Sequence, residues 1–243
     1  MSYAVKAIFD TIQGEGARAG TRAVFIRLAG CNLWDGRPEH RDRGKGACAR
    51  WCDTDFVGGE KMTAEAVAER AKQLWTTGDD RWVVISGGEP TLQVDPPLID
   101  ALHKAGFRIA METNGTDNSD CLDDIDWITV SPKLGGEVVL TRGSELKVVL
   151  PGAVGGEQGW TDQMLLDLAS RSTYRYKFVQ PMDPLLSTQT EDTLLHPRTL
   201  YKEPHQLLAR DAYDTHLIRC LSFVRAHPDW RLGAQLHKVW QLP

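Results

Sequence analysis

Short runs of apolar, strand-forming residues recur along the chain. Several are continuously apolar, a pattern typical of parallel strands that are buried on both faces. These runs predict six strands, at residues 24–28, 82–86, 107–112, 127–130, 146–150 and 176–179.

Segments with the apolar spacing of α-helices lie between these strands, and a longer one follows the last of them. The predicted helices are residues 63–75, 97–104, 161–169 and 207–226. Strand and helix in alternation imply crossover connections around a parallel sheet, and six such strands would form a partial or complete α/β barrel. The functional residues of such a barrel lie at the C-terminal ends of its strands.

Length and composition add the expectation of a single domain over residues 1–243. Of the 243 residues, 42% are hydrophobic and 25% charged, as in a globular protein with one well-filled core. A stretch near residues 184–205 is polar, contains prolines and lacks periodicity. We interpret it as a surface insertion that could form a lid.

The charge pattern gives no support for binding to nucleic acid or to a membrane. The formal net charge is -5, and basic residues occur singly or in pairs without a long basic run. The N-terminal residues lack a signal-peptide core, and no apolar run approaches the roughly 18 residues that span a bilayer. We therefore expect a cytoplasmic protein.

Three of the five cysteines lie close together in a loop that follows the first predicted strand. Cys31, Cys48 and Cys52 have the spacing C-x16-C-x3-C, and an odd total count fits thiolate chemistry better than disulfides. Soft thiolate ligands suit an iron-sulfur cluster or zinc. Spacing alone leaves open a cluster, a structural zinc site with His40 as fourth ligand, or uncoordinated thiols.

The strand at 82–86 continues into Ser86, Gly87, Gly88, Glu89 and Pro90, where two glycines allow close approach of a ligand to the backbone. Three cysteines followed by this motif resemble the radical S-adenosylmethionine superfamily. The resemblance implies a partial (β/α)6 barrel and a 4Fe–4S cluster held by three cysteines, with one iron open for S-adenosylmethionine. The superfamily's usual spacing is C-x3-C-x2-C, so both gaps are longer here.

Further segments are similar to the 7-carboxy-7-deazaguanine synthase family of that superfamily over almost the whole chain. They are residues 12–16, Arg27, 29–33, 52–55, 112–116, 131–133, 180–183, and His237 with the C-terminal Pro243. The resemblance implies conversion of 6-carboxy-5,6,7,8-tetrahydropterin to 7-carboxy-7-deazaguanine with loss of ammonia, in queuosine biosynthesis. It also implies a homodimer and an electron donor such as flavodoxin.

The same resemblance assigns site residues in three groups. The cysteines act catalytically through the cluster, and Thr54 is the expected Mg²⁺ ligand, although it could also be a turn residue. Residues expected at S-adenosylmethionine are Trp51, Asp53, Gly88, Glu89, Ser131, Pro132, Lys133, Gln180, Pro181, Met182 and Asp183. Residues expected at the substrate are Ile12, Gln13, Gly14, Glu15, Arg27, Ser86, His237 and Pro243, the last through its free carboxylate.

Several assignments have structural alternatives. Arg27 could form a salt bridge at the end of its strand, and Glu112 and Asn114 could support the site indirectly or belong to a turn. Cys121 and Cys220 have no partner motif, so we interpret them as structural. Competing functions are an activase that installs a glycyl radical in a partner protein and a zinc-stabilised binding module without catalytic activity.

Overall fold

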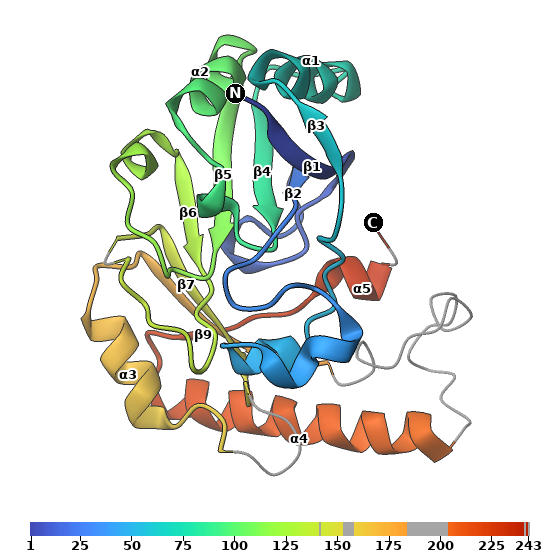
Figure 1. Cartoon of the computed structure of the whole chain (residues 1–243). Helices are drawn as coiled ribbons and strands as arrows, with labels where there is room; N and C mark the ends of the chain where they lie inside the picture. Colours follow the sequence, from blue (N-terminus) through green and yellow to red (C-terminus); the bar gives the residue numbers. More distant parts are fainter. Residues whose placement is uncertain (141, 153–157, 184–203, 241, 243) are drawn as a thin grey trace.

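A nine-stranded sheet organises the chain, in the order β3-β1-β2-β4-β5-β6-β7-β8-β9 (Figure 1). The computed structural model describes residues 1–140, 142–152, 158–183, 204–240 and 242, with side chains omitted for 204–211. The strands are β1 (Tyr3–Ile12), β2 (Arg22–Leu28), β3 (Glu60–Met62), β4 (Arg81–Gly87), β5 (Phe107–Thr113), β6 (Trp127–Val130), β7 (Glu145–Leu150), β8 (Tyr176–Pro181) and β9 (Arg231–Leu232).

The six predicted strands are confirmed as β2 and β4 to β8, and they pair in parallel. Three further strands extend the sheet. β1 pairs antiparallel with β2, β3 pairs antiparallel with β1, and β9 adds to β8 in parallel. The sheet is not closed, because β3 and β9 form its two ends. The predicted partial barrel is therefore confirmed, with the extra strands at its edges.

The four predicted helices are also confirmed, with bounds shifted by a few residues at most. Three begin at a side-chain cap, since Thr63, Asp95 and Thr161 each accept a backbone N–H from the first turn. The helices are α1 (Ala64–Leu74), α2 (Pro96–Lys104), α3 (Asp162–Ser170), α4 (Pro204–Ala226) and a short α5 (Leu236–Trp240). The crossover from β5 to β6 has only a 3₁₀ helix, η5 (Asp120–Asp124).

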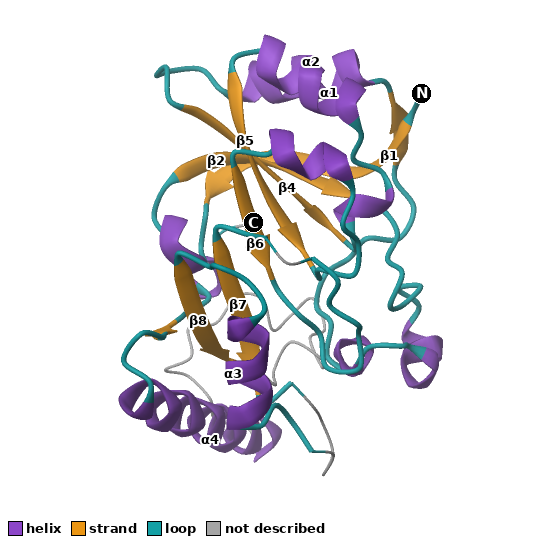
Figure 2. Cartoon of the chain, turned by 90° about the vertical axis from the view of Figure 1, so that its left-hand side faces the viewer, coloured by secondary structure: helices purple, strands orange, loops and turns teal. Residues whose placement is uncertain are grey.

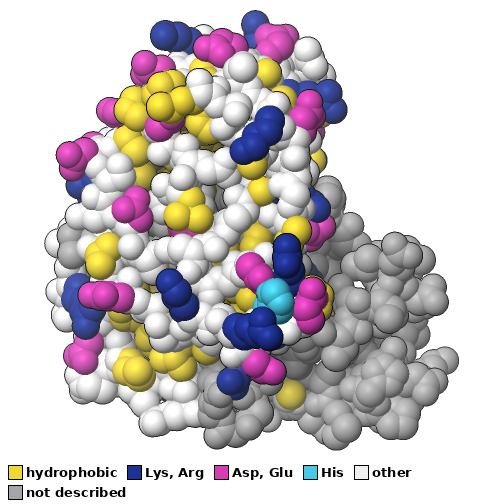
Figure 3. Space-filling view, in the orientation of Figure 1, with side chains coloured by type: hydrophobic (Ala, Val, Ile, Leu, Met, Phe, Trp, Pro, Cys, Tyr) yellow, Lys and Arg dark blue, Asp and Glu magenta, His cyan; other side chains and the backbone are white. Residues whose placement is uncertain are grey.

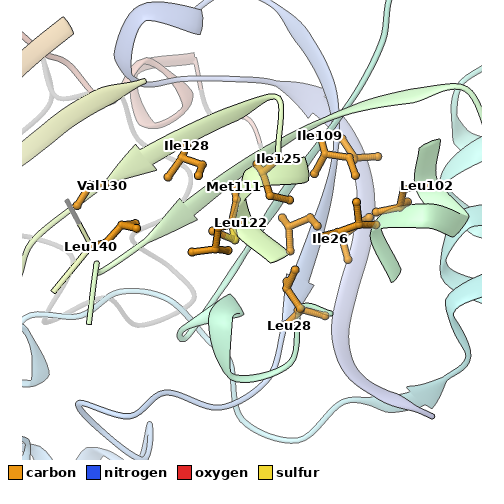
Figure 4. Packing of buried hydrophobic residues seen from close by; sticks show 14 of the residues in the cluster. Ile26, Leu28, Leu102, Ile109, Met111, Leu122, Ile125, Ile128, Val130 and Leu140 are labelled. Carbon is orange, nitrogen blue, oxygen red and sulfur yellow. The ribbon is translucent and has the colours of Figure 1, made fainter. Parts of the chain in front are cut away.

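One face of the sheet packs against the helices and forms the main core. α1 lies beside β1 and β2, α2 lies beside β5, and α4 lies beside β7 and β8 (Figure 2). Side chains of alternate strand residues enter this core, and Ile26, Leu28, Ile109 and Met111 are fully buried in it (Figure 4). The period of two therefore directs the other half of each strand's side chains to the opposite face.

That opposite face is apolar at one end and polar at the other. Near the N-terminal ends of the strands, Ala23, Trp82, Val84 and Ala110 form a second small core. The guanidinium of Arg18 lies over the Trp82 ring, 3.3 Å from its centroid. Towards the C-terminal ends the inward positions become polar or charged, so the polar side chains gather at one end of the sheet.

Most of the predicted insertion at 184–205 lies outside the described residues. None of the helices that are described is long and apolar enough to cross a membrane. On the face seen in Figure 3, Lys and Arg side chains are interspersed with Asp and Glu.

Candidate active site

A cavity of about 230 Å³ lies at the C-terminal ends of the parallel strands. It is lined by residues from β1, β2, β4, β5, β7 and β8, together with the cysteine loop and the C-terminal helix. The sequence-predicted residues that line it are Ile12, Gln13, Gly14, Glu15, Arg27, Cys31, Cys48, Trp51, Cys52, Asp53, Thr54, Ser86, Gly88, Ser131, Lys133, Gln180 and His237.

Some predicted residues do not line this cavity. Pro132, Pro181 and Met182 are buried beside lining residues, and Asp183 is partly exposed. Pro243 lies outside the described residues. The roles predicted for all of these residues stay predictions.

Glu89 is fully buried and also stands behind the cavity wall. Its carboxylate accepts hydrogen bonds from the Thr91 hydroxyl (2.8 Å), the Thr113 hydroxyl (2.7 Å) and the Asn114 backbone N–H (2.7 Å). Burial raises the pKa of Glu89, although these donors oppose the shift. Glu89 thus joins the loop after β4 to the end of β5.

The long loop between Cys31 and Cys48 folds back through backbone and side-chain bonds. Lys45 N–H donates to the Leu33 carbonyl (2.7 Å), and Ala47 N–H donates to the Leu134 carbonyl (2.8 Å). The Arg41 guanidinium donates to the carbonyls of Ala49 (2.8 Å) and Cys52 (3.2 Å). These contacts bring the distant cysteines to one cavity despite the enlarged gap.

All three cysteine side chains line the cavity as free thiols. Burial raises the pKa of Cys48 to about 12 and also raises that of Cys52. Among the described residues, no three His, Cys, Asp or Glu side chains converge as ligands of a single ion. A 4Fe–4S cluster places each thiolate on a different iron, so its ligands stand farther apart than those of one zinc ion.

His40, the fourth ligand of the alternative zinc site, points elsewhere. Its imidazole Nδ1 bonds to the Asp35 carboxylate, and it does not line the cavity. The geometry therefore favours the cluster over the zinc module.

Part of the cavity lining is a charged network that sequence reasoning missed in part. The buried Lys147 ammonium donates to Glu15 and to Glu112, the latter at 3.2 Å. Gln13 donates to the other Glu112 oxygen (2.9 Å), and Gln180 donates to Glu15 (3.3 Å). Lys147 lies inside a predicted buried strand. This was a sequence signal that could have revealed the network, because a buried ammonium needs anionic partners.

The C-terminal helix α5 closes one side of the cavity. Leu236 N–H donates to the Gly14 carbonyl (2.9 Å), and the Gln235 amide donates to Glu15 (2.9 Å). Lys238 pairs with Asp53 at 2.7 Å, so α5 also contacts the segment after Cys52. Burial lowers the pKa of His237, and its imidazole is therefore neutral near pH 7.

We expect Gly14→Ala to displace α5 and to raise the substrate KM by roughly tenfold. A Cβ at this position would stand 2.4 Å from His237 Nδ1 and 2.6 Å from the His237 backbone nitrogen. Steady-state kinetics measure the effect. Gly106→Ala is the control, because nothing lies within 4 Å of its Cβ and Gly106, although its φ of +84° also strains an alanine, does not line the cavity. An unchanged KM in Gly14→Ala would contradict the close contact with α5.

Five buried polar atoms of residues that line the cavity have no hydrogen-bond partner among the described residues. They are Thr11 Oγ1, Arg27 Nε, Trp34 Nε1, Trp51 Nε1 and Gln180 Oε1. Leaving a buried polar group unpaired costs about 1–3 kcal/mol. Their gathering around one cavity indicates a site that is completed by polar ligands.

Curated proteins named 7-carboxy-7-deazaguanine synthase are similar to the chain over its length. The protein from Burkholderia multivorans is 43% identical over 250 residues and that from Caulobacter vibrioides 41% over 251, each covering 100% of both chains. The protein from Escherichia coli K12 is 31% identical and covers 98% of both.

The solved structures and the family models give two further results. The crystal structure of QueE from Escherichia coli matches 97% of this chain and 94% of that chain, with a TM-score of 0.64 and 26% sequence identity. No family model matches the chain. Since full-length relatives share up to 43% of its residues, the chain belongs to the 7-carboxy-7-deazaguanine synthase family.

Proposed function

We propose that the cavity is the active site of a radical S-adenosylmethionine lyase of queuosine biosynthesis. It converts 6-carboxy-5,6,7,8-tetrahydropterin to 7-carboxy-7-deazaguanine with loss of ammonia. The observation that carries the proposal is the meeting of three cysteine thiols, a Gly-Gly strand end and a carboxylate–amide network in one cavity. Family membership favours this synthase over a glycyl-radical activase.

The cysteine side of the cavity fits the cluster and the cofactor. Cys31, Cys48 and Cys52 would hold a 4Fe–4S cluster, which when reduced would supply the electron that cleaves S-adenosylmethionine to methionine and a 5'-deoxyadenosyl radical. The unpaired Trp51 indole N–H and the backbone around Gly88 offer bonds to the cofactor.

Further contacts to S-adenosylmethionine belong to the ends of β6 and β8. Lys133 donates to the Ser131 hydroxyl at 2.7 Å, which keeps that side chain at the cavity wall. Gln180 has a free carbonyl oxygen that can accept a cofactor N–H or O–H. Pro132, Pro181, Met182 and Asp183 shape these strand ends, and Glu89 orients Gly88 from behind.

The opposite side of the cavity fits a pterin. Arg27 keeps an unpaired Nε–H that can donate to the substrate carboxylate, as a guanidinium does in charge-assisted bonds. Glu15 and Glu112 are acceptors suited to the N–H groups of the pterin edge, and Gln13, Ser86 and His237 supply further polar atoms. We propose the Pro243 carboxylate as a further acceptor.

Magnesium, assembly and electron supply extend the proposal. Thr54 lines the cavity, and its hydroxyl suits a hard cation that also takes the substrate carboxylate. We propose one domain over residues 1–243, assembled as a homodimer in the cytoplasm and reduced by a donor such as flavodoxin. The continuous nine-stranded sheet supports the single domain.

An anaerobic assay of the reconstituted enzyme tests the function. With reductant, S-adenosylmethionine and 6-carboxy-5,6,7,8-tetrahydropterin, we expect 7-carboxy-7-deazaguanine and ammonia in equal amounts. Added Mg²⁺ should raise kcat/KM in the wild type but not in Thr54→Val. If the fully reconstituted cluster enzyme yields no deazaguanine product, the proposed function is wrong.

A further inference from the structure

Lys147 is a buried cation that the family resemblance assigned to no role. Its side chain is 3% exposed and points from the middle of β7 into the polar end of the sheet. The ammonium contacts Glu15, which follows β1, and Glu112 on β5. Lys147, Glu15 and Glu112 all line the cavity, so one ammonium joins two carboxylates that face the substrate.

The charged groups around the Lys147 ammonium differ in whether they face the cavity. The carboxylates of Glu15, Glu112 and Glu145 all lie close enough to raise the pKa of Lys147, and the His237 imidazole of α5 lies close to Glu15. Glu145 is held apart from the cavity, because its oxygens accept from the Thr129 hydroxyl (2.8 Å) and the Ala17 N–H (2.8 Å). The carboxylates that face the cavity therefore depend mainly on Lys147 for charge compensation.

The effect on protonation follows from burial and charge. Burial alone would raise the pKa of Glu15, but the charge of the Lys147 ammonium and its hydrogen bond outweigh it, so this pKa lies well below its usual range. Burial alone would lower the pKa of Lys147, but Glu112, Glu15 and Glu145 raise it above its usual value. Both groups are therefore charged at neutral pH.

We propose that Lys147 is a positioning residue, which holds the Glu15 and Glu112 carboxylates in place so that their oxygens accept the N–H groups of the pterin edge. An ionised carboxylate accepts hydrogen bonds at both oxygens, whereas a protonated one must donate from one of them. Each carboxylate has further fixed donors, Gln13 on Glu112 and Gln235 on Glu15. Lys147 compensates the negative charge of the two carboxylates, and these amide groups fix the orientation of the carboxylates. This inference rests on the proposed function of the cavity.

The test compares Lys147→Met, which removes the charge but keeps a similar stem, with Lys147→Arg, which keeps the charge. In Lys147→Met we expect the KM for the pterin to rise by roughly tenfold or more, with a smaller change in kcat. Iron and sulfide content, and deoxyadenosine formation without pterin, should equal those of the wild type. Lys177→Met is the matched control, because Lys177 on β8 pairs with Asp229 away from the cavity lining.

The pH profile separates positioning from a structural role. Without the ammonium, burial raises the pKa of Glu15, so the acid limb of kcat/KM should move to higher pH in Lys147→Met. In Lys147→Arg the limb should stay in place, even if the altered geometry raises KM.

Two results would refute the inference: a KM and pH profile in Lys147→Met that match those of Lys177→Met, or the same acid-limb shift in both Lys147 variants. If Lys147→Met does not fold, Lys147→Arg still decides, because an acid limb moved to higher pH despite the retained charge refutes the role. Failure of the wild type to form product would instead refute the proposed function.

Discussion

Cys48→Ala and Cys52→Ala should each lose the iron-sulfur cluster, and product formation should fall to background. Each cysteine supplies one of the three thiols that line the cavity, and a cluster bound through only two protein ligands would not be held in place. Iron and sulfide analysis after anaerobic reconstitution measures the loss directly. Product assays on the same samples measure its consequence.

Cys121→Ala is the control for thiol removal. Cys121 contacts the Ser119 hydroxyl (3.3 Å) and the Val94 carbonyl (3.6 Å) and does not line the cavity. This variant should keep wild-type iron, sulfide and turnover. Wild-type iron content in Cys48→Ala or Cys52→Ala, or cluster loss in Cys121→Ala, would contradict the assigned ligands.

Gly88→Ala should lower turnover by about a hundredfold or more, because the reacting groups shift by an ångström or so. A Cβ here would lie 2.0 Å from the Gly30 carbonyl oxygen and 2.8 Å from Cys31 Cβ. Glu89 N–H also donates to that Gly30 carbonyl at 2.8 Å. The loop after β4 therefore has to move away from the cysteine loop. Deoxyadenosine formation with and without the pterin measures the damage.

Gly78→Ala separates this contact from a general effect of replacing glycine. Gly78 has φ +87°, which strains an alanine, but nothing lies within 4 Å of the added Cβ. We expect its turnover to equal that of the wild type. Equal deoxyadenosine formation by Gly88→Ala and wild type would show that the two loops need not touch.

Local patterns were sufficient for most of the secondary structure. Parallel strands buried on both faces require continuous apolar runs, and capped amphipathic helices carry their own start signals, so both could be read within short windows. β1 (Tyr3–Ile12) was missed, since only half of it is strongly apolar and its pairing with β2 and β3 is antiparallel. β9 has two exposed residues, which carry no burial pattern.

The candidate site likewise has a part that local sequence patterns predict and a part that they do not. Cysteine spacing and the Gly-Gly strand end are continuous motifs, and the family resemblance that they support was confirmed by the relatives. Lys147 finds its partners 132 and 35 residues away, and Gln235 reaches Glu15 across 220 residues. No local pattern identifies such partners.

The sequence by itself determined the family and the order along the chain of the six parallel strands and the four longer helices, and it predicted the cysteines and glycines of the site. Each of these depends on residue types at short spacing, where backbone geometry and burial act locally. Only the tertiary structure decided that Lys147 compensates Glu15 and Glu112, that Glu89 stands behind the cavity, and that α5 seats on Gly14. A buried charge can be compensated by any group of opposite charge that folding brings near, wherever that group lies in the chain.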